Sequence, residues 1–172
     1  MRYLIAAAGC FFAVSLTASL TPYVKVLGVT PDLLLIFVAC WAMVRGRAEA
    51  MVVVPIAGLL RDLMTSDPVG TSVLALAPVV FLSSLRDLRP VESEFLPAVA
   101  VVAAATFAYA IVSMVVLTAV GDDVPWWTAT LRVTLPAMVV NPLFAVIVYA
   151  PMRWLTPRPR AESFGVGSAV QL

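Results

Sequence analysis

The chain has 172 residues, of which 62% are hydrophobic and only 12% are charged, and its formal net charge is +1. Soluble domains carry about 25% charged residues, so this composition excludes an ordinary soluble domain and indicates a membrane protein. No basic face or aromatic stacking platform accompanies the arginines, which argues against nucleic-acid binding. There is no histidine, and Cys10 and Cys40 lie in apolar runs without ligand-spaced neighbours, so neither a metal nor another cofactor is expected.

The first apolar run covers residues 3–24 without a charge, which is long enough to cross about 30 Å of hydrocarbon as a helix. A cleaved signal peptide with Arg2 at its basic end is the alternative; we expect a retained span because further spans follow. The second run opens at Thr30-Pro31-Asp32. There Thr30 is expected as the N-cap and Pro31 at the first helical position, with Asp32 next to the positive helix end.

The second and third runs are short, because Arg45 ends one and Arg61-Asp62 ends the other. A single re-entrant hairpin is therefore the alternative to two spans. A hairpin would keep Arg45 and Arg47 from reaching the side on which Arg86 and Arg89 lie, against the arginine bias. We therefore predict two spans, which snorkelling end residues or a locally thinned bilayer would accommodate.

Three longer runs follow, and proline, glycine and charge replace them at the end of the chain. The whole pattern predicts an all-α integral membrane protein, a bundle of six transmembrane helices, because backbone groups in lipid must be satisfied within each segment. The predicted membrane domain is 1–156, with spans at about 3–24, 31–44, 48–64, 69–85, 95–120 and 128–152. Residues 157–172 are expected to form a flexible cytoplasmic tail.

The charged residues between the runs are sorted onto alternate connections. Every second connection carries arginine, at Arg2, Arg45, Arg47, Arg86, Arg89, Arg153, Arg158 and Arg160. The other connections carry only Lys25 with Asp67, Asp122 and Asp123. Because cytoplasmic loops retain lysine and arginine, both ends of the chain are predicted to lie in the cytoplasm.

Asp62 is the intramembrane charge that most needs a partner. Arg61 points about 100° away from it on a helix, whereas Gly58 lies one turn earlier on the same face. Gly58 would let a neighbouring helix approach closely. The structural interpretation is an ion pair in the outer interface with Arg132, and the functional alternative is a conformational latch or ligand contact.

Proline and alanine patterns add further expectations. Asn141-Pro142 is typical of a broken helix at a transport site, but without a matching break elsewhere a packed, kinked bundle is the preferred interpretation. Ala100, Ala104 and Ala108 form a stripe of small residues that permits close helix packing, and packing within the chain is expected for most of it.

The segment from residue 30 to residue 80 carries a more specific pattern. TPDLLLI at residues 30–36, followed by Trp41-Ala42, resembles the start of the second helix of the rod shape-determining protein MreD family. GLLRD at residues 58–62 and DPVG at residues 67–70 resemble that family's glycine, its aspartate four residues later and its Pro-x-Gly turn. The motif positions fall on Pro31, Asp32, Gly58, Asp62, Pro68 and Gly70. Arg61 and Asp67 add charges to this pattern.

This resemblance implies a noncatalytic component of the bacterial cell-elongation machinery in the inner membrane. It implies partnership with the transmembrane helix of MreC, and a shared complex with RodA, a class B penicillin-binding transpeptidase and MreB. It also implies a fold similar to the membrane substrate-binding component of energy-coupling-factor transporters, although fold does not decide function. The leading hypothesis is thus a scaffold that affects cell shape, and the alternative is a vitamin-like small-molecule-binding subunit of a transporter.

Overall fold

The computed structural model describes residues 2–20, 23–65, 68–84 and 95–155, and within these ranges the expected all-α architecture is confirmed. The elements are α1 (Arg2–Leu20), α2 (Leu33–Arg45), α3 (Arg47–Asp62), α4 (Thr71–Leu82), α5 (Phe95–Val120), α6 (Trp126–Ala129), the π-helix η2 (Thr130–Thr134) and α7 (Leu135–Leu155). An isolated bridge between Val26 and Val29 is the single piece of β pairing in the described part.

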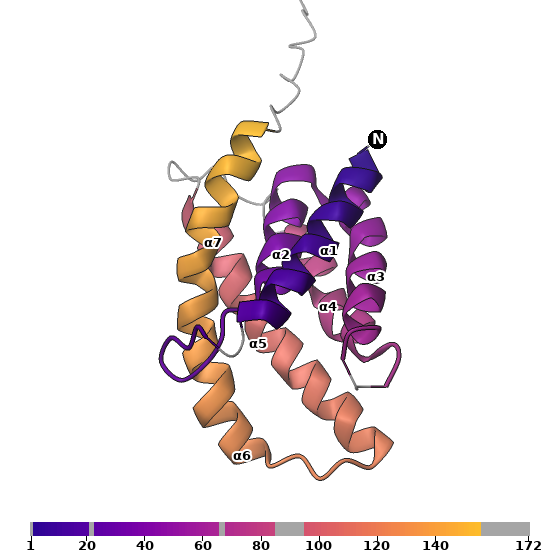
Figure 1. The fold of residues 1–172 in the computed structure, drawn as a ribbon, viewed down its shortest axis with the longest axis vertical. Helices are drawn as coiled ribbons and strands as arrows, with labels where there is room; N and C mark the ends of the chain where they lie inside the picture. The colour runs from indigo at the N-terminus through magenta and orange to yellow at the C-terminus, as the bar shows by residue number, and fades with distance from the viewer. Residues whose placement is uncertain (1, 21–22, 66–67, 85–94, 156–172) are drawn as a thin grey trace, which may run out of the picture.

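The helices run alternately up and down (Figure 1). The start of α1, the tight turn between α2 and α3 and the end of α7 lie at one end of the bundle, and the loop between α5 and α6 lies at the other. Toward that other end, α5 and the α6–η2–α7 arm extend past the shorter helices α2, α3 and α4. The described arginines of the alternate connections, Arg45, Arg47 and Arg153, are thereby gathered at one end.

Helix α2 is the centre of the bundle and contacts α1, α3, α4, α5 and α7. It is apolar on every side, and ten of its 13 residues, from Leu34 to Val44, are buried. A helix that is hydrophobic all round is stable only where other helices surround it, so this short run forms the core. Helix α1 packs closely on α2 at Gly9, where a Cβ would collide with the ring of Phe37.

Several helix bounds differ from the predicted spans. α1 ends at Leu20 rather than at 24, and a loop with left-handed residues at Leu27 and Gly28 leads to α2. α4 covers 71–82 rather than 69–85, whereas α5 covers the predicted 95–120. The last arm begins at Trp126 rather than at 128. The connection 86–94 and the tail 157–172 lie outside the described residues.

Three of the described helical stretches, 3–20, 96–120 and 126–154, are long and apolar enough to cross a membrane. Helices α2 and α4 are apolar but shorter. At about 1.5 Å per residue, the 13 residues of α2 rise about 20 Å, which is less than the hydrocarbon thickness of about 30 Å. The polar residues at the end of α3 and the start of α2 therefore lie inside the depth that α5 and α7 can span.

The π-helix near the start of the last arm was not expected from the sequence. It replaces ordinary helical bonding over Thr130–Thr134, and the N–H of Leu135 donates to the carbonyl of Thr130. Pro136 follows directly and has no N–H to donate to the carbonyl of Arg132. A widened turn before a proline is one way for a helix to keep its backbone groups bonded, and α7 then continues unbroken through Pro142.

Candidate functional site

The first polar contact of the bundle joins the start of α2 to the end of α3. Asp32 caps α2, because its Oδ1 accepts the N–H of Leu35 at 3.1 Å. Its Oδ2 accepts a hydrogen bond from the guanidinium of Arg61 at 2.5 Å. Asp32 is therefore the N-cap expected at Thr30, and Pro31 lies fully buried just before the helix rather than in its first turn. One carboxylate both starts a helix and neutralises a cation on the next one.

Arg61 also contacts α5. Its guanidinium lies over the ring of Tyr109, with 4.9 Å between Cζ and the ring centroid. A guanidinium at this distance is attracted to the aromatic face, and the attraction is larger where water is scarce. Arg61 thus contacts both an aspartate of α2 and a tyrosine of α5.

Asn141, on α7, links the start of α2 to α5. Its Oδ1 accepts the backbone N–H of Asp32 at 3.0 Å, and its Nδ2 donates to Thr106 Oγ1 at 3.1 Å. Asn141 is 1% exposed, so both groups are satisfied away from water. The residue before Pro142 is therefore a structural bridge within a continuous α7, which agrees with the packed-bundle interpretation over a broken transport helix.

Asp62 faces a different helix. Its Oδ2 accepts the N–H of Gly70 at 2.6 Å, and its Oδ1 accepts the N–H of Ser72 at 3.0 Å. Gly70 has a φ of 101°, a left-handed conformation that favours glycine, and the N–H of Thr71 bonds to the carbonyl of Pro68 at 3.1 Å. The Pro68–Gly70 turn thus presents the first N–H groups of α4 to a buried carboxylate, as anions at helix N-termini commonly receive them.

The expected ion pair between Asp62 and Arg132 is corrected by this geometry. Asp62 is 3% exposed and occupied by backbone donors, whereas Arg132 lies exposed on η2. The expectation treated Asp62 as a charge seeking a countercharge. Two backbone N–H groups at a helix start supply the same stabilisation without another ion.

Gly58 is where α3 and α4 touch. A Cβ on Gly58 would lie 2.5 Å from Cα and 2.6 Å from N of Val73, so any side chain would press on backbone. This close approach, which the sequence suggested for Gly58, holds Asp62 one turn later within reach of the α4 amides. Gly58, Asp62, Pro68 and Gly70 therefore form one unit, the α3–α4 junction.

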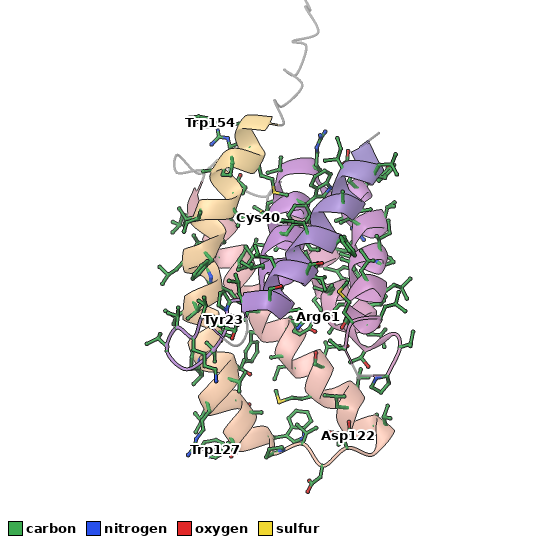
Figure 2. All side chains as sticks on the ribbon, in the orientation of Figure 1. Tyr23, Cys40, Arg61, Asp122, Trp127 and Trp154 are labelled. Carbon is green, nitrogen blue, oxygen red and sulfur yellow. The ribbon has the colours of Figure 1, made fainter. Side chains whose placement is uncertain are left out.

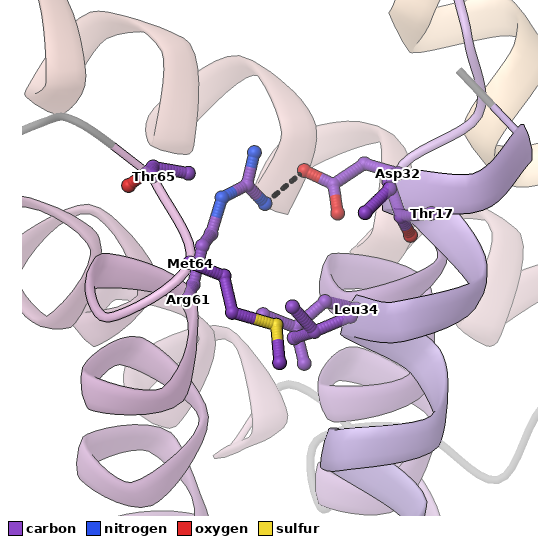
Figure 3. A pocket seen from close by; sticks show the side chains of 8 residues that line it. Thr17, Asp32, Leu34, Arg61, Met64 and Thr65 are labelled. Atoms are coloured by element: carbon purple, nitrogen blue, oxygen red, sulfur yellow. Dashed lines mark hydrogen bonds and ion pairs between the residues drawn. The ribbon is translucent and has the colours of Figure 1, made fainter. Parts of the chain in front are cut away.

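A cavity of about 200 Å³ lies beside the Asp32–Arg61 pair (Figure 3). Its walls come from α1, from the start of α2, and from the end of α3 with the turn that follows it, and they comprise Val14, Thr17, Ala18, Asp32, Leu34, Arg61, Met64 and Thr65. In Figure 3 the ion pair bridges the cavity between α3 and α2, while Met64 and Leu34 point toward each other on another side. The cavity therefore has a charged wall on one side and an apolar wall on another.

The sequence pattern indicated the residues of the α3–α4 junction. It did not indicate the residues of α5 and α7 that contact Asp32 and Arg61. Tyr109 and Thr106 carry no local signal, because nothing near them in the sequence marks them as contacts of α2 or α3. In the sequence, Asn141 stands out for its proline neighbour rather than for its amide. A buried amide inside an apolar helix is itself a signal, since it must find partners.

The bundle and its enclosed polar contacts define a helical integral membrane protein. The family model for the rod shape-determining protein MreD matches residues 2–158 of the chain, and the protein belongs to this family. It is a family of membrane proteins that act structurally in the shape-determining system with MreC and MreB. No curated protein and no solved structure matches the chain, so the expected similarity to energy-coupling-factor components stays a prediction.

Proposed function

We propose that this protein is a noncatalytic scaffold of the bacterial cell-elongation complex, with six spans in the inner membrane and both ends in the cytoplasm. It binds the transmembrane helix of MreC and helps to position RodA and the class B penicillin-binding transpeptidase near MreB, and so regulates cell shape. The family match over residues 2–158 is the observation that carries this proposal.

The distribution of charge supports the proposed orientation. Arg45, Arg47 and Arg153 lie at one end of the bundle, and Asp122 and Asp123 lie in the loop at the opposite end. Figure 2 labels Trp154 and Asp122 at these two extremes. By the positive-inside rule the arginine end faces the cytoplasm, and Trp127 falls in the outer headgroup layer.

A face of α5 is the proposed contact with MreC. Leu96, Ala100 and Phe107 are exposed on it, and Ala104 and Ala108 are half-buried. The core side of α5 instead uses Ala98, Val101, Val102 and Ala105. Packing within the chain, expected for most of the alanine stripe, therefore leaves Ala100 uncovered, and small residues at a lipid-facing surface allow a second helix to approach closely.

Site-specific crosslinking in cells tests this contact. A photoreactive residue at Ala100 is expected to crosslink to MreC, whereas the same residue at Ile147, exposed on α7, serves as the matched control. Ala100→Leu is expected to weaken copurification with MreC, and depletion of the protein is expected to round the cells. Equal crosslinking from both positions, or rod shape that persists on depletion, would contradict the scaffold role.

The cavity beside Asp32 and Arg61 favours the alternative, a small-molecule-binding subunit of a transporter. Transport requires that a solute cross the bundle, and the core around α2 is filled by apolar side chains. Uptake of a labelled solute that depends on this protein would establish the alternative; a ligand bound without transport would leave the scaffold role intact.

A further inference from the structure

We propose that the cavity between α1, α2 and α3 binds a zwitterionic group, an ammonium joined to a phosphate, such as the headgroup of an aminophospholipid. This cavity is a different part of the molecule from the α5 face, and binding there goes beyond the scaffold role. It rests on the cavity and on the ion pair in its wall.

The size and lining of the cavity fit a small polar group with an apolar continuation. About 200 Å³ greatly exceeds the roughly 30 Å³ that one water occupies in the liquid. Val14, Leu34 and Met64 supply apolar wall, and the charged wall is the Asp32–Arg61 pair. A mostly apolar pocket with a few convergent polar groups is the usual form of a ligand site.

The ion pair remains accessible although it is formed. The side chains of Arg61 and Asp32 are 23% and 17% exposed, whereas Asp62, at the end of α3, is 3% exposed and hydrogen-bonded to the start of α4. A ligand in the cavity therefore meets both charges of the pair and does not meet Asp62.

Because the Asp32–Arg61 pair carries no net charge, it favours a ligand that bears both a positive and a negative group. A lone anion near Arg61 is repelled by Asp32, and a lone cation near Asp32 is repelled by Arg61. A zwitterion lying antiparallel to the pair places its ammonium by the carboxylate and its phosphate by the guanidinium. Each of the four charges then has two opposite neighbours, and the Asp32–Arg61 bond need not break.

Two sources offer this chemistry: a membrane lipid, whose glycerol and acyl chains would continue along the apolar wall, and a soluble zwitterion. Native mass spectrometry of the full chain in detergent distinguishes them. The probes are dioleoylphosphatidylethanolamine, the anionic dioleoylphosphatidylglycerol, and soluble glycerophosphoethanolamine. The wild-type protein is expected to retain the ethanolamine lipid at least about tenfold more than the glycerol lipid.

Variants assign that preference to the cavity. Asp32→Asn keeps an N-cap but removes the negative charge, so the ratio of the two lipids should fall to about one or favour the anion. Asp123→Asn, in the exposed loop, is the matched control and should leave the ratio unchanged. Ala18→Phe fills the cavity from an exposed position, so it should abolish selective retention while copurification with MreC persists.

Each outcome decides the proposal. Displacement of the lipid by glycerophosphoethanolamine, or selective binding of that probe alone, supports a soluble ligand of the same chemistry. Retention of the lipid without displacement supports the lipid source. Equal retention of both lipids without binding of the soluble probe, or a preference that both Asp32→Asn and Ala18→Phe leave unchanged, would overturn the zwitterion site.

Discussion

Gly58 and Val73 hold α3 and α4 in backbone contact, since a Cβ on Gly58 would lie 2.5 Å from Val73 Cα. The contact fixes the separation of the two helices at the point where Asp62 must reach the N–H groups of Gly70 and Ser72. Close packing and the buried hydrogen bonds are thus two parts of one junction, and each can be disturbed separately.

Adding a single methyl group at Gly58 tests the packing part. Gly58→Ala places carbon against the backbone of Val73, which cannot rotate away as a side chain could. We expect a loss of about 1–3 kcal/mol in the free energy of unfolding, despite the better helix propensity of alanine. The measurement is reversible unfolding in mixed micelles. Ala48→Ser, an addition of one atom at an exposed position of α3, should change stability by less than about 0.5 kcal/mol. Equal free energies of unfolding for the two variants would contradict this prediction, because they would mean that α3 and α4 can move apart without a loss of stability.

Removing the Asp62 carboxylate tests the hydrogen-bonded part. Asp62→Ala leaves two backbone N–H groups without an acceptor, and such groups cost about 1–3 kcal/mol each when buried. We expect a loss of at least about 2 kcal/mol, and partial recovery in Asp62→Asn, whose single carbonyl accepts one bond. Asp123→Ala in the exposed loop is the control. Asp62→Leu should also disturb assembly more than Asp32→Asn; wild-type behaviour of both would refute that order.

A double-mutant cycle measures the coupling between Asp32 and Arg61. Asp32→Asn and Arg61→Gln keep most of each side chain, and their combination isolates the interaction of the two charges. The pair is short but partly exposed, so solvent screening limits the expected coupling to about 1 kcal/mol. The pair Arg45–Glu49, whose charged atoms lie 3.8 Å apart across the tight turn between α2 and α3, is the internal comparison and should give less than about 0.5 kcal/mol. A larger coupling for Arg45–Glu49 would mean that the Asp32–Arg61 contact contributes little.

The residues that sequence reasoning placed correctly are those governed by neighbours on the same helix. Gly58 and Asp62 share a face because they are four residues apart, and Arg61 points elsewhere for the same reason. Partner choice was not predictable in this way. Asp32 and Asn141 are 109 positions apart, and their contact depends on how α7 is rotated about its axis.

The wrong partner was predicted for Asp62 for the same reason, because spacing along one helix does not show which distant segment a side chain meets. Asp62 and Arg132 were both expected near the outer end of the bundle, and the sequence offered no way to see that α4 starts at the carboxylate. The bounds of α5 were predictable because charge flanks a long apolar run. Those of α2 were less so, since Thr30 and Asp32 are both good N-caps and tertiary contacts with Arg61 and Asn141 favour Asp32.

Cysteine accessibility tests whether α2 and α3 cross the bilayer separately. Cys10 and Cys40 are fully buried, so an impermeant maleimide should leave the wild-type protein almost unlabelled. With six spans, Trp127→Cys is labelled in intact spheroplasts, whereas Arg47→Cys is labelled only after permeabilisation. Both wild-type side chains are exposed, so access to the reagent rather than burial decides the result. If α2 and α3 formed a re-entrant hairpin, the later connections would keep their sides, but the turn between α2 and α3 would not reach the cytoplasm, and permeabilisation would not increase the labelling of Arg47→Cys. Labelling of Arg47→Cys that permeabilisation does not increase would therefore refute separate crossings of α2 and α3, and protection of Trp127→Cys in intact spheroplasts would refute the proposed orientation.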